Sequence, residues 1–300
     1  MADFDEYDLF LQTWVPGERL IHASLSQNIN DPYSRKRLLD DSTGTAPVKR
    51  VQFAAGQKVM ADDELAARAF DFFQARHSKW AGHFRDYVLS SDVPETKFNA
   101  FVASFADLWV DGKSRRQDSE LMRAIKVSIR NLDRLRYPNH AGKWVINPVD
   151  DGVSPFFTED EMGVIFDANT GLIEGLLPDY IDCLGDEGPG SLGDLYVRRG
   201  VRMPHIDGLR RELHYLSSYS LALGPVEQFA QTWTPATKDA GIPSIFSAPI
   251  SAIQHRVVAF APFIDGMDLA QLEFVVAPPV EETSLRDDGL HGGIREFSFQ

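Results

Sequence analysis

The sequence AQLEFVVAPP, residues 270–279, is an apolar run that carries a glutamine and a glutamate two positions apart and ends at a double proline. In a β-strand, successive side chains point to opposite faces. We therefore expect Leu272 and Phe274 on the buried face, and Gln271 and Glu273 together on the other. Two polar groups held on one face of a rigid strand suit chemistry at a sugar-like centre, because the carboxylate stabilises developing positive charge while the carboxamide orients the incoming group.

Two upstream segments also have the composition of strands that end in polar residues. DLYVRRGV, residues 194–201, contains Arg199 next to Gly200, and LHYLSSYS, residues 213–220, ends in Ser-Tyr-Ser. Together with Glu273 these segments give the chain order arginine, serine, glutamate. Each of these residues alone is better explained as part of an ordinary strand surface, so the hypothesis depends on their order and on the strands that carry them.

These segments resemble the Arg-Ser-Glu class of mono-ADP-ribosyltransferases, which includes clostridial C3-like exoenzymes, vertebrate ecto-transferases and phage enzymes that modify host proteins. The resemblance covers about residues 192–280. It rests on Arg199-Gly200, which is similar to the family's Arg-Gly, on Ser218-Tyr219-Ser220, which is similar to its Ser-Thr-Ser, and on Gln271-Leu272-Glu273, which is similar to its Gln-x-Glu. The resemblance implies an NAD-binding core that transfers ADP-ribose to a macromolecule and releases nicotinamide, with residues 263–270 as the loop that meets the target.

The chemistry of NAD gives each of these residues a role. A guanidinium offers a planar fork of donors to pyrophosphate or ribose oxygens, which suits Arg199. A fixed carboxylate hydrogen-bonded to a ribose hydroxyl stabilises the charge that appears as nicotinamide leaves, which suits Glu273. Ser218 would orient Glu273 or a ribose hydroxyl, and the resemblance places Ser220 beside NAD as well. Gly200 would allow the backbone to approach the nicotinamide amide closely.

The sequence also departs from the family pattern. Tyr219 replaces the small middle residue of Ser-Thr-Ser, and Arg198 competes with Arg199 for the arginine role. Gln271 stands where members that modify arginine usually have a glutamate, and glutamine there is similar to members that modify asparagine, threonine, glutamine or guanine in DNA. We expect Gln271 to orient the acceptor, most simply a protein side chain. Nucleic acid as the acceptor is one alternative, and a non-catalytic interaction protein on the same fold is the other.

The composition is that of a globular protein. The chain has 300 residues, of which 43% are hydrophobic and 25% charged, and its net charge is −14. An acidic excess argues against a protein that coats nucleic acid, because phosphate backbones are bound by lysine and arginine. The single cysteine cannot form an internal disulfide, and the histidines occur singly, without the further ligands of a metal site. The acidic start and the absence of a long apolar run predict a soluble, cytoplasmic protein, with delivery into a host cell left open.

Helical periodicity dominates the first half of the chain. Residues 4–14 suggest a short helix, residues 28–50 an exposed loop, and Asp62 or Asp63 the start of a longer helix. Apolar stripes at the helical period predict helices over residues 94–109 and 118–136, with Leu135 directed inward in the second. The basic face of residues 118–136 is better explained as a solvated surface than as a docking site.

The pattern of predicted secondary structure changes after about residue 150. Thr158 and Glu161 form a capping box that opens a helix, which we expect Pro178 to interrupt. Strands prevail from residue 193 to the end, apart from a short helix that packs through Val226, Phe229 and Ala230. The sequence thus predicts an α+β fold. Residues 1–150 form a mainly helical N-terminal region for docking, regulation or target recognition, and residues 151–300 form a mixed β-sheet, ADP-ribosyltransferase-like catalytic domain that binds NAD.

Overall fold

The computed structural model describes residues 18–22, 48–52, 62–109, 119–138, 152–185, 188–203, 216–231, 241–278, 285–291 and 293–299. The helices are α3 Asp62–Ser90, α4 Glu95–Ala103, the π-helix η2 Ser104–Trp109, α6 Glu120–Arg136, α7 Glu159–Leu184, α9 Leu223–Gln231 and α10 Ile250–Ile253, with 3₁₀ turns η5 Leu192–Asp194, η7 Gln254–Arg256 and η8 Ala261–Phe263. The strands are β1 Glu18–His22, β2 Val48–Gln52, β3 Tyr196–Met203, β4 Ser217–Ser220, β5 Ile242–Pro249, β6 Val257–Phe260, β7 Glu273–Val276, β8 Leu285–His291 and β9 Ile294–Phe299.

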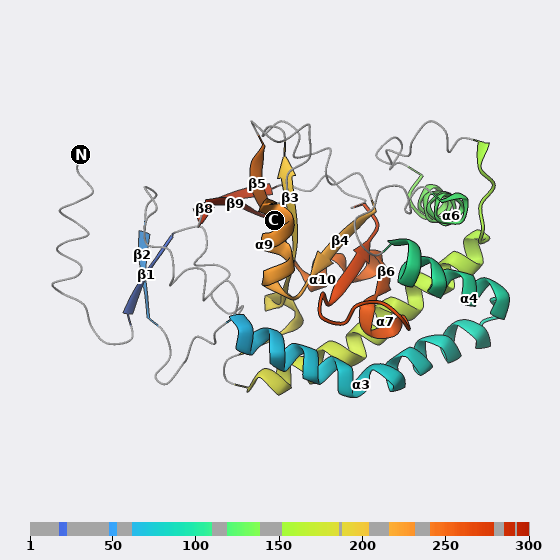
Figure 1. Cartoon of the computed structure of the whole chain (residues 1–300), viewed down its shortest axis with the longest axis horizontal. Helices are drawn as coiled ribbons and strands as arrows, with labels where there is room; N and C mark the ends of the chain where they lie inside the picture. The colour runs from blue at the N-terminus through green and yellow to red at the C-terminus, as the bar shows by residue number, and fades with distance from the viewer. Residues whose placement is uncertain are drawn as a thin grey trace.

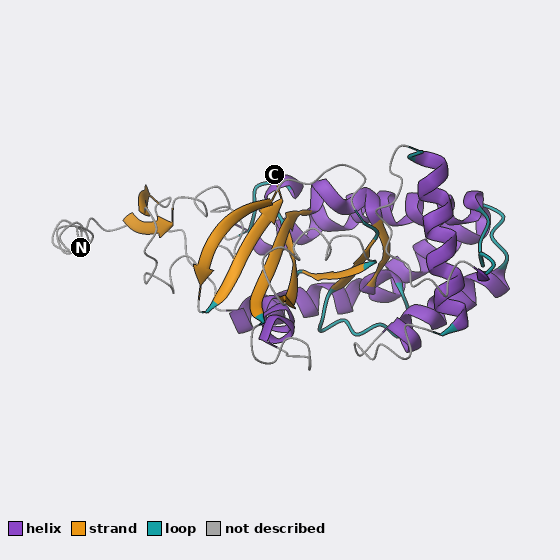
Figure 2. Cartoon of the chain, turned by 90° about the horizontal axis from the view of Figure 1, so that it is seen from above, coloured by secondary structure: helices purple, strands orange, loops and turns teal. Residues whose placement is uncertain are grey.

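A mixed seven-stranded sheet organises the second half of the chain. Its strand order is β6-β7-β4-β3-β5-β9-β8, and the neighbouring strands are antiparallel except for the parallel pair β5 and β9. Figure 2 shows the strands as a curved sheet flanked by helices. The α+β class and the mixed sheet are therefore confirmed. Strands β1 and β2 form a separate antiparallel pair.

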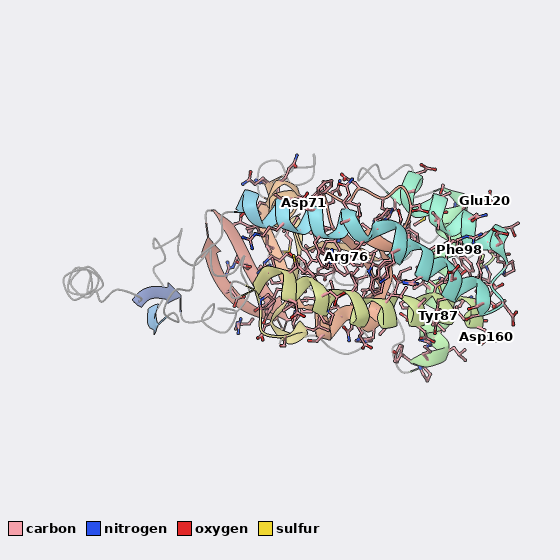
Figure 3. All side chains as sticks on the ribbon, turned by 90° about the horizontal axis from the view of Figure 1, so that it is seen from below. Asp71, Arg76, Tyr87, Phe98, Glu120 and Asp160 are labelled. Carbon is pink, nitrogen blue, oxygen red and sulfur yellow. The ribbon has the colours of Figure 1, made fainter. Side chains whose placement is uncertain are left out.

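The helical layer is built on two long helices. Helices α3 and α7 lie side by side across one side of the molecule, where Asp71, Arg76 and Tyr87 mark the course of α3 (Figure 3). In Figure 1, α4 and α6 lie at the end of the molecule away from β8 and β9. The ring of Phe73 in α3 lies 5.0 Å from that of Tyr180 in α7 and 5.8 Å from that of Phe260 in β6, measured between centroids. Helix α3 thus packs against both the second long helix and the sheet.

The hydrophobic core continues across residue 150. A single cluster of buried side chains extends from Ala69 in α3 to Ile294 in β9. Phe101 of α4 contacts Phe157 with the ring centroids 6.0 Å apart. The composition of the chain changes near residue 150, but the helices before that point and the sheet after it share buried apolar surface.

A buried ion pair adds a polar link between the helical region and the sheet. Arg256 Nη1 and Nη2 donate to the two carboxylate oxygens of Asp133 in α6 at 2.7 and 2.6 Å. The same guanidinium donates to the carbonyl oxygen of Pro278, just beyond β7. Asp133 and Arg256 are 2% and 3% exposed. Arg256, just before β6, thereby links α6 to the segment that follows β7.

The helix predictions are confirmed in outline and wrong in three details. The capping box is present, because the Thr158 hydroxyl accepts from the Glu161 N–H and the Glu161 carboxylate accepts from the Thr158 N–H. Helix α7 continues through Pro178 instead of ending there. Leu135 is 66% exposed and Phe229 is 50% exposed, so neither side chain contributes to the core as expected. Both residues lie in the last turn of their helices.

The predictions for the first sixty residues are tested only in part. The segment 4–14 lies outside the described residues. Strand β2 begins at Val48, inside the segment 28–50 that was expected to be an exposed loop. Within the described part of the chain, no helix has both the length and the apolar composition needed to cross a membrane.

Candidate active site

Glu273 is the first residue of β7 and the centre of a small polar cluster. Its Oε1 atom accepts hydrogen bonds from the Ser218 hydroxyl on β4 and from the indole Nε1 of Trp109, the latter at 2.8 Å. The same indole N–H also lies 3.2 Å from the Ser218 Oγ. The β4–β7 pairing, with Ser218 opposite Val275 and Ser220 opposite Glu273, brings the serine and the glutamate to one face. Two of the sequence-predicted residues are therefore in direct contact.

The environment of Glu273 disfavours its charged form. The residue is 9% exposed, and this burial is the largest influence and raises the pKa of its carboxyl. The hydrogen bonds from Ser218 and Trp109 and the positive charge of Arg199 lower the pKa, while the negative charge of Asp268 adds to the increase. A buried carboxyl with a raised pKa, held by dedicated donors, is typical of a functional group, since such groups need a pKa matched to their task.

Only one of the two adjacent arginines on β3 is available to a ligand. The Cα pairing of Arg198 with Ser220 would by itself favour Arg198. However, the Arg198 side chain is 1% exposed, and its Nε lies 3.8 Å from the Glu296 carboxylate in β9. Arg199 is partly exposed, and its charge acts on Glu273. Arg198 therefore belongs to an ion pair of the core, and Arg199 is the arginine with exposed surface. The strand pairings place Arg198 on the face of Ser218 and Glu273 and Arg199 on the opposite face, so Arg199 does not join the cluster by direct contact.

Gly200 allows helix α9 to pack directly on β3. A Cβ atom built at Gly200 would lie 1.8 Å from the carbonyl oxygen of Val226 and 2.9 Å from the backbone nitrogen of Ala230. Because side chains alternate along a strand, Arg198 shares this covered face and Arg199 points to the other. We expected the glycine to permit the approach of nicotinamide, whereas the structure uses the missing side chain for the approach of a helix.

Ser220 and Gln271 stabilise the turn that leads into Glu273. The Ser220 hydroxyl accepts from the N–H of Ala222 at 2.8 Å and donates to the carbonyl oxygen of Gln271, so it is engaged with the backbone. Strand β7 begins at Glu273, and Leu272 has a left-handed φ of 43°. The expectation that Gln271 and Glu273 share a strand face is therefore wrong, because the chain turns between them. The Gln271 side chain is partly exposed and its Nε2 lies 3.4 Å from Asp268 Oδ2.

The structure explains one departure from the family pattern and adds a residue that the sequence did not indicate. Tyr219 points into the core, 5% exposed and with its ring centroid 6.4 Å from that of Phe299, and burial raises the pKa of its hydroxyl to about 12. A large residue is therefore accommodated between the two serines. Trp109 was predicted as one member of the apolar stripe over residues 94–109. No local pattern distinguishes an indole that fills the core from one that also donates to a carboxylate far along the chain.

Comparisons with known proteins found no relative that could assign the site. No protein-family model matches the sequence, and no curated protein and no solved structure matches it at a significant level. Among the described residues, no group of three or more histidine, cysteine, aspartate or glutamate side chains could hold a metal ion.

Proposed function

We propose that the protein is a mono-ADP-ribosyltransferase that uses NAD to modify a macromolecule, most simply a protein side chain. The observation that carries this proposal is the Glu273 carboxylate, which is buried at the start of β7, is held by Ser218 and Trp109, and has its pKa lowered by the charge of Arg199. This set combines a fixed negative charge for an oxocarbenium ion with a positive charge for a pyrophosphate.

The reaction requires the glycosidic bond between C1′ of the ribose and nicotinamide to break. The bonding electron pair goes to the nicotinamide nitrogen and neutralises it, which leaves an oxocarbenium-like ribose. Glu273 would accept a hydrogen bond from a ribose hydroxyl and stabilise that charge, which is greatest in the transition state. A nucleophile of the acceptor then bonds to C1′ and gives its proton to water. Arg199 would bind the pyrophosphate as a fork of N–H donors.

The segment before β7, residues 263–270, is a suitable surface for the acceptor. It is anchored to α3, because His77 lies with Nδ1 3.0 Å from the carbonyl oxygen of Pro262 and Nε2 3.1 Å from the carboxylate of Asp265. Gln271, partly exposed at the end of this segment, would orient the acceptor. The net charge of −14 favours a protein over a nucleic acid, since an acidic protein repels phosphate backbones.

Incubation of the protein with labelled NAD and a cell lysate tests the proposal. The wild type should attach label to macromolecules, and the label should be sensitive to protease and resistant to nuclease. Glu273→Gln should abolish labelling, because it keeps the shape and removes the charge. Glu161→Gln is the matched control, since Glu161 also accepts hydrogen bonds but caps α7, and its labelling should equal that of the wild type.

A second variant separates chemistry from acceptor choice. Gln271→Ala should reduce labelling of the acceptor while nicotinamide release with water as the acceptor continues, because residue 271 is proposed to contact the acceptor and not the ribose. Equal loss of both activities would refute this division of roles. Labelling that nuclease removes would instead favour a nucleic-acid acceptor, and no reaction with NAD at all would favour a non-catalytic interaction protein.

A further inference from the structure

Among the described residues, Trp109 is the side chain of the N-terminal helical region that donates a hydrogen bond to Glu273. Trp109 is the last residue of the π-helix η2, is 4% exposed, and packs against Phe105 with ring centroids 6.0 Å apart. Lys126 of α6 lies with Nζ 5.9 Å from the centroid of the indole. π-Helical turns often occur at functional positions, where they redirect a side chain. Here the turn ends at the residue that contacts Glu273.

The two oxygens of the Glu273 carboxylate have different surroundings. Both the Ser218 hydroxyl and the Trp109 indole donate to Oε1. None of the residues that the structure describes donates a hydrogen bond to Oε2. An indole N–H is a donor only, so its interaction favours the carboxylate over the carboxylic acid and fixes which oxygen faces the protein. The other oxygen is left for a hydroxyl of a ligand.

We infer that Trp109 is a positioning residue, which holds one oxygen of Glu273 so that the other meets a ribose hydroxyl of NAD. This inference rests on the proposed transferase function and gives the helical region a part in the chemistry. Ser218 alone could not fix the carboxylate in the same way, because a hydroxyl rotates and can act as donor or acceptor. The rigid ring of Trp109 supplies a donor in a fixed direction from a separate part of the fold.

The kinetic test compares Trp109→Phe with Trp80→Phe. Phenylalanine at position 109 keeps an aromatic ring and removes the donor. Trp80 stacks on Phe263 with centroids 6.2 Å apart, and its indole makes no hydrogen bond with any described residue, so the same substitution there controls for lost ring volume. We expect Trp109→Phe to lower kcat for NAD hydrolysis at least about tenfold with little change in KM, as loss of a hydrogen bond to a charged group predicts. Trp80→Phe should leave kcat unchanged.

The pH dependence of hydrolysis adds a readout that a merely structural role would not move. The groups that act on Glu273 are Ser218, Trp109, Arg199 and Asp268, so removal of the indole donor should raise the carboxyl pKa further and shift the acid limb of kcat/KM to higher pH. Equal effects of the two tryptophan substitutions on kcat and on the acid limb would overturn the inference. Faster hydrolysis by Trp109→Phe would also overturn it, because the indole would then obstruct the site.

A measurement without substrate separates this inference from the proposed function. The ¹⁵N–¹H resonance of the Trp109 indole, assigned by its loss in Trp109→Phe, should move as Glu273 titrates, and the movement should vanish in Glu273→Gln. The indole resonance of Trp80 should not move with this titration. An indole signal of Trp109 that ignores Glu273 would overturn the inference whatever the activity. If the Trp109 resonance follows the titration of Glu273 but the wild-type protein does not consume NAD, the proposed function is refuted and the hydrogen bond between Trp109 and Glu273 is supported.

Discussion

Replacement of Asp133 by asparagine should lower the free energy of unfolding by about 3–5 kcal/mol, the usual result of removing one partner from a buried ion pair. Asp133 and Arg256 are 2% and 3% exposed and are joined by two hydrogen bonds of 2.6 and 2.7 Å. The asparagine side chain would present one acceptor oxygen, and no charge, to a guanidinium that has lost access to water. Since domains are commonly stable by only about 5–15 kcal/mol, the loss should be large in urea unfolding followed by circular dichroism.

An exposed ion pair on the same helix provides the matched control. Arg136 Nη2 lies 3.4 Å from the Asp167 carboxylate, and the two side chains are 37% and 59% exposed. Asp167→Asn should therefore lower the free energy of unfolding by no more than about 1 kcal/mol. The double variant Asp133→Leu with Arg256→Met should recover much of the loss, because it removes both charges. A cost for Asp133→Asn no greater than that for Asp167→Asn would refute the view that this pair ties α6 to the sheet.

Three further predictions concern the site and its support. Gly200→Ala should lower the free energy of unfolding by about 1–3 kcal/mol, because the new Cβ would lie 1.8 Å from a backbone oxygen of α9. The control Gly171→Ala, in open space within α7, should be neutral or stabilising by up to about 1 kcal/mol. Equal shifts in melting temperature for the two variants would show that α9 adjusts freely to the added Cβ. Glu273→Gln should match the wild type in free energy of unfolding at low pH and exceed it increasingly as pH rises through the raised pKa of the carboxyl. The difference should reach about 1.4 kcal/mol for each unit by which folding raises that pKa. A difference independent of pH would contradict the conclusion that burial disfavours the charged form of Glu273. Arg199→Lys should raise the KM for NAD about tenfold, while Arg198→Lys should lower stability with KM unchanged, and the reverse pattern would exchange the two assignments.

The sequence predicts those parts of the fold that local patterns specify. Apolar residues at the helical period indicate α3, α4 and α6, and the capping box of Thr158 and Glu161 sets the start of α7. Alternation indicates β9. In each of these cases a short stretch of chain contains the whole physical reason. The contact between Ser218 and Glu273 was instead expected from the family resemblance, and it depends on the pairing of β4 with β7.

Features that depend on distant contacts could not be predicted in this way. The indole of Trp109 meets Glu273 across 164 positions of sequence, and nothing near either residue specifies that meeting. The close approach of α9 to Gly200 likewise depends on tertiary packing. The turn at Leu272 was missed for a different reason. A left-handed φ at a leucine is rare, and the apolar pattern of residues 270–276 fits an uninterrupted strand.

The rate at which the purified protein releases nicotinamide from NAD tests the role of Glu273 most directly. We expect slow release by the wild type with water as the acceptor, no release by Glu273→Gln at equal or greater thermal stability, and wild-type release by Glu161→Gln. Release by Glu273→Gln at the wild-type rate would show that the carboxylate held by Ser218 and Trp109 does not stabilise the departing charge, and would contradict the assignment of this cluster as the active site.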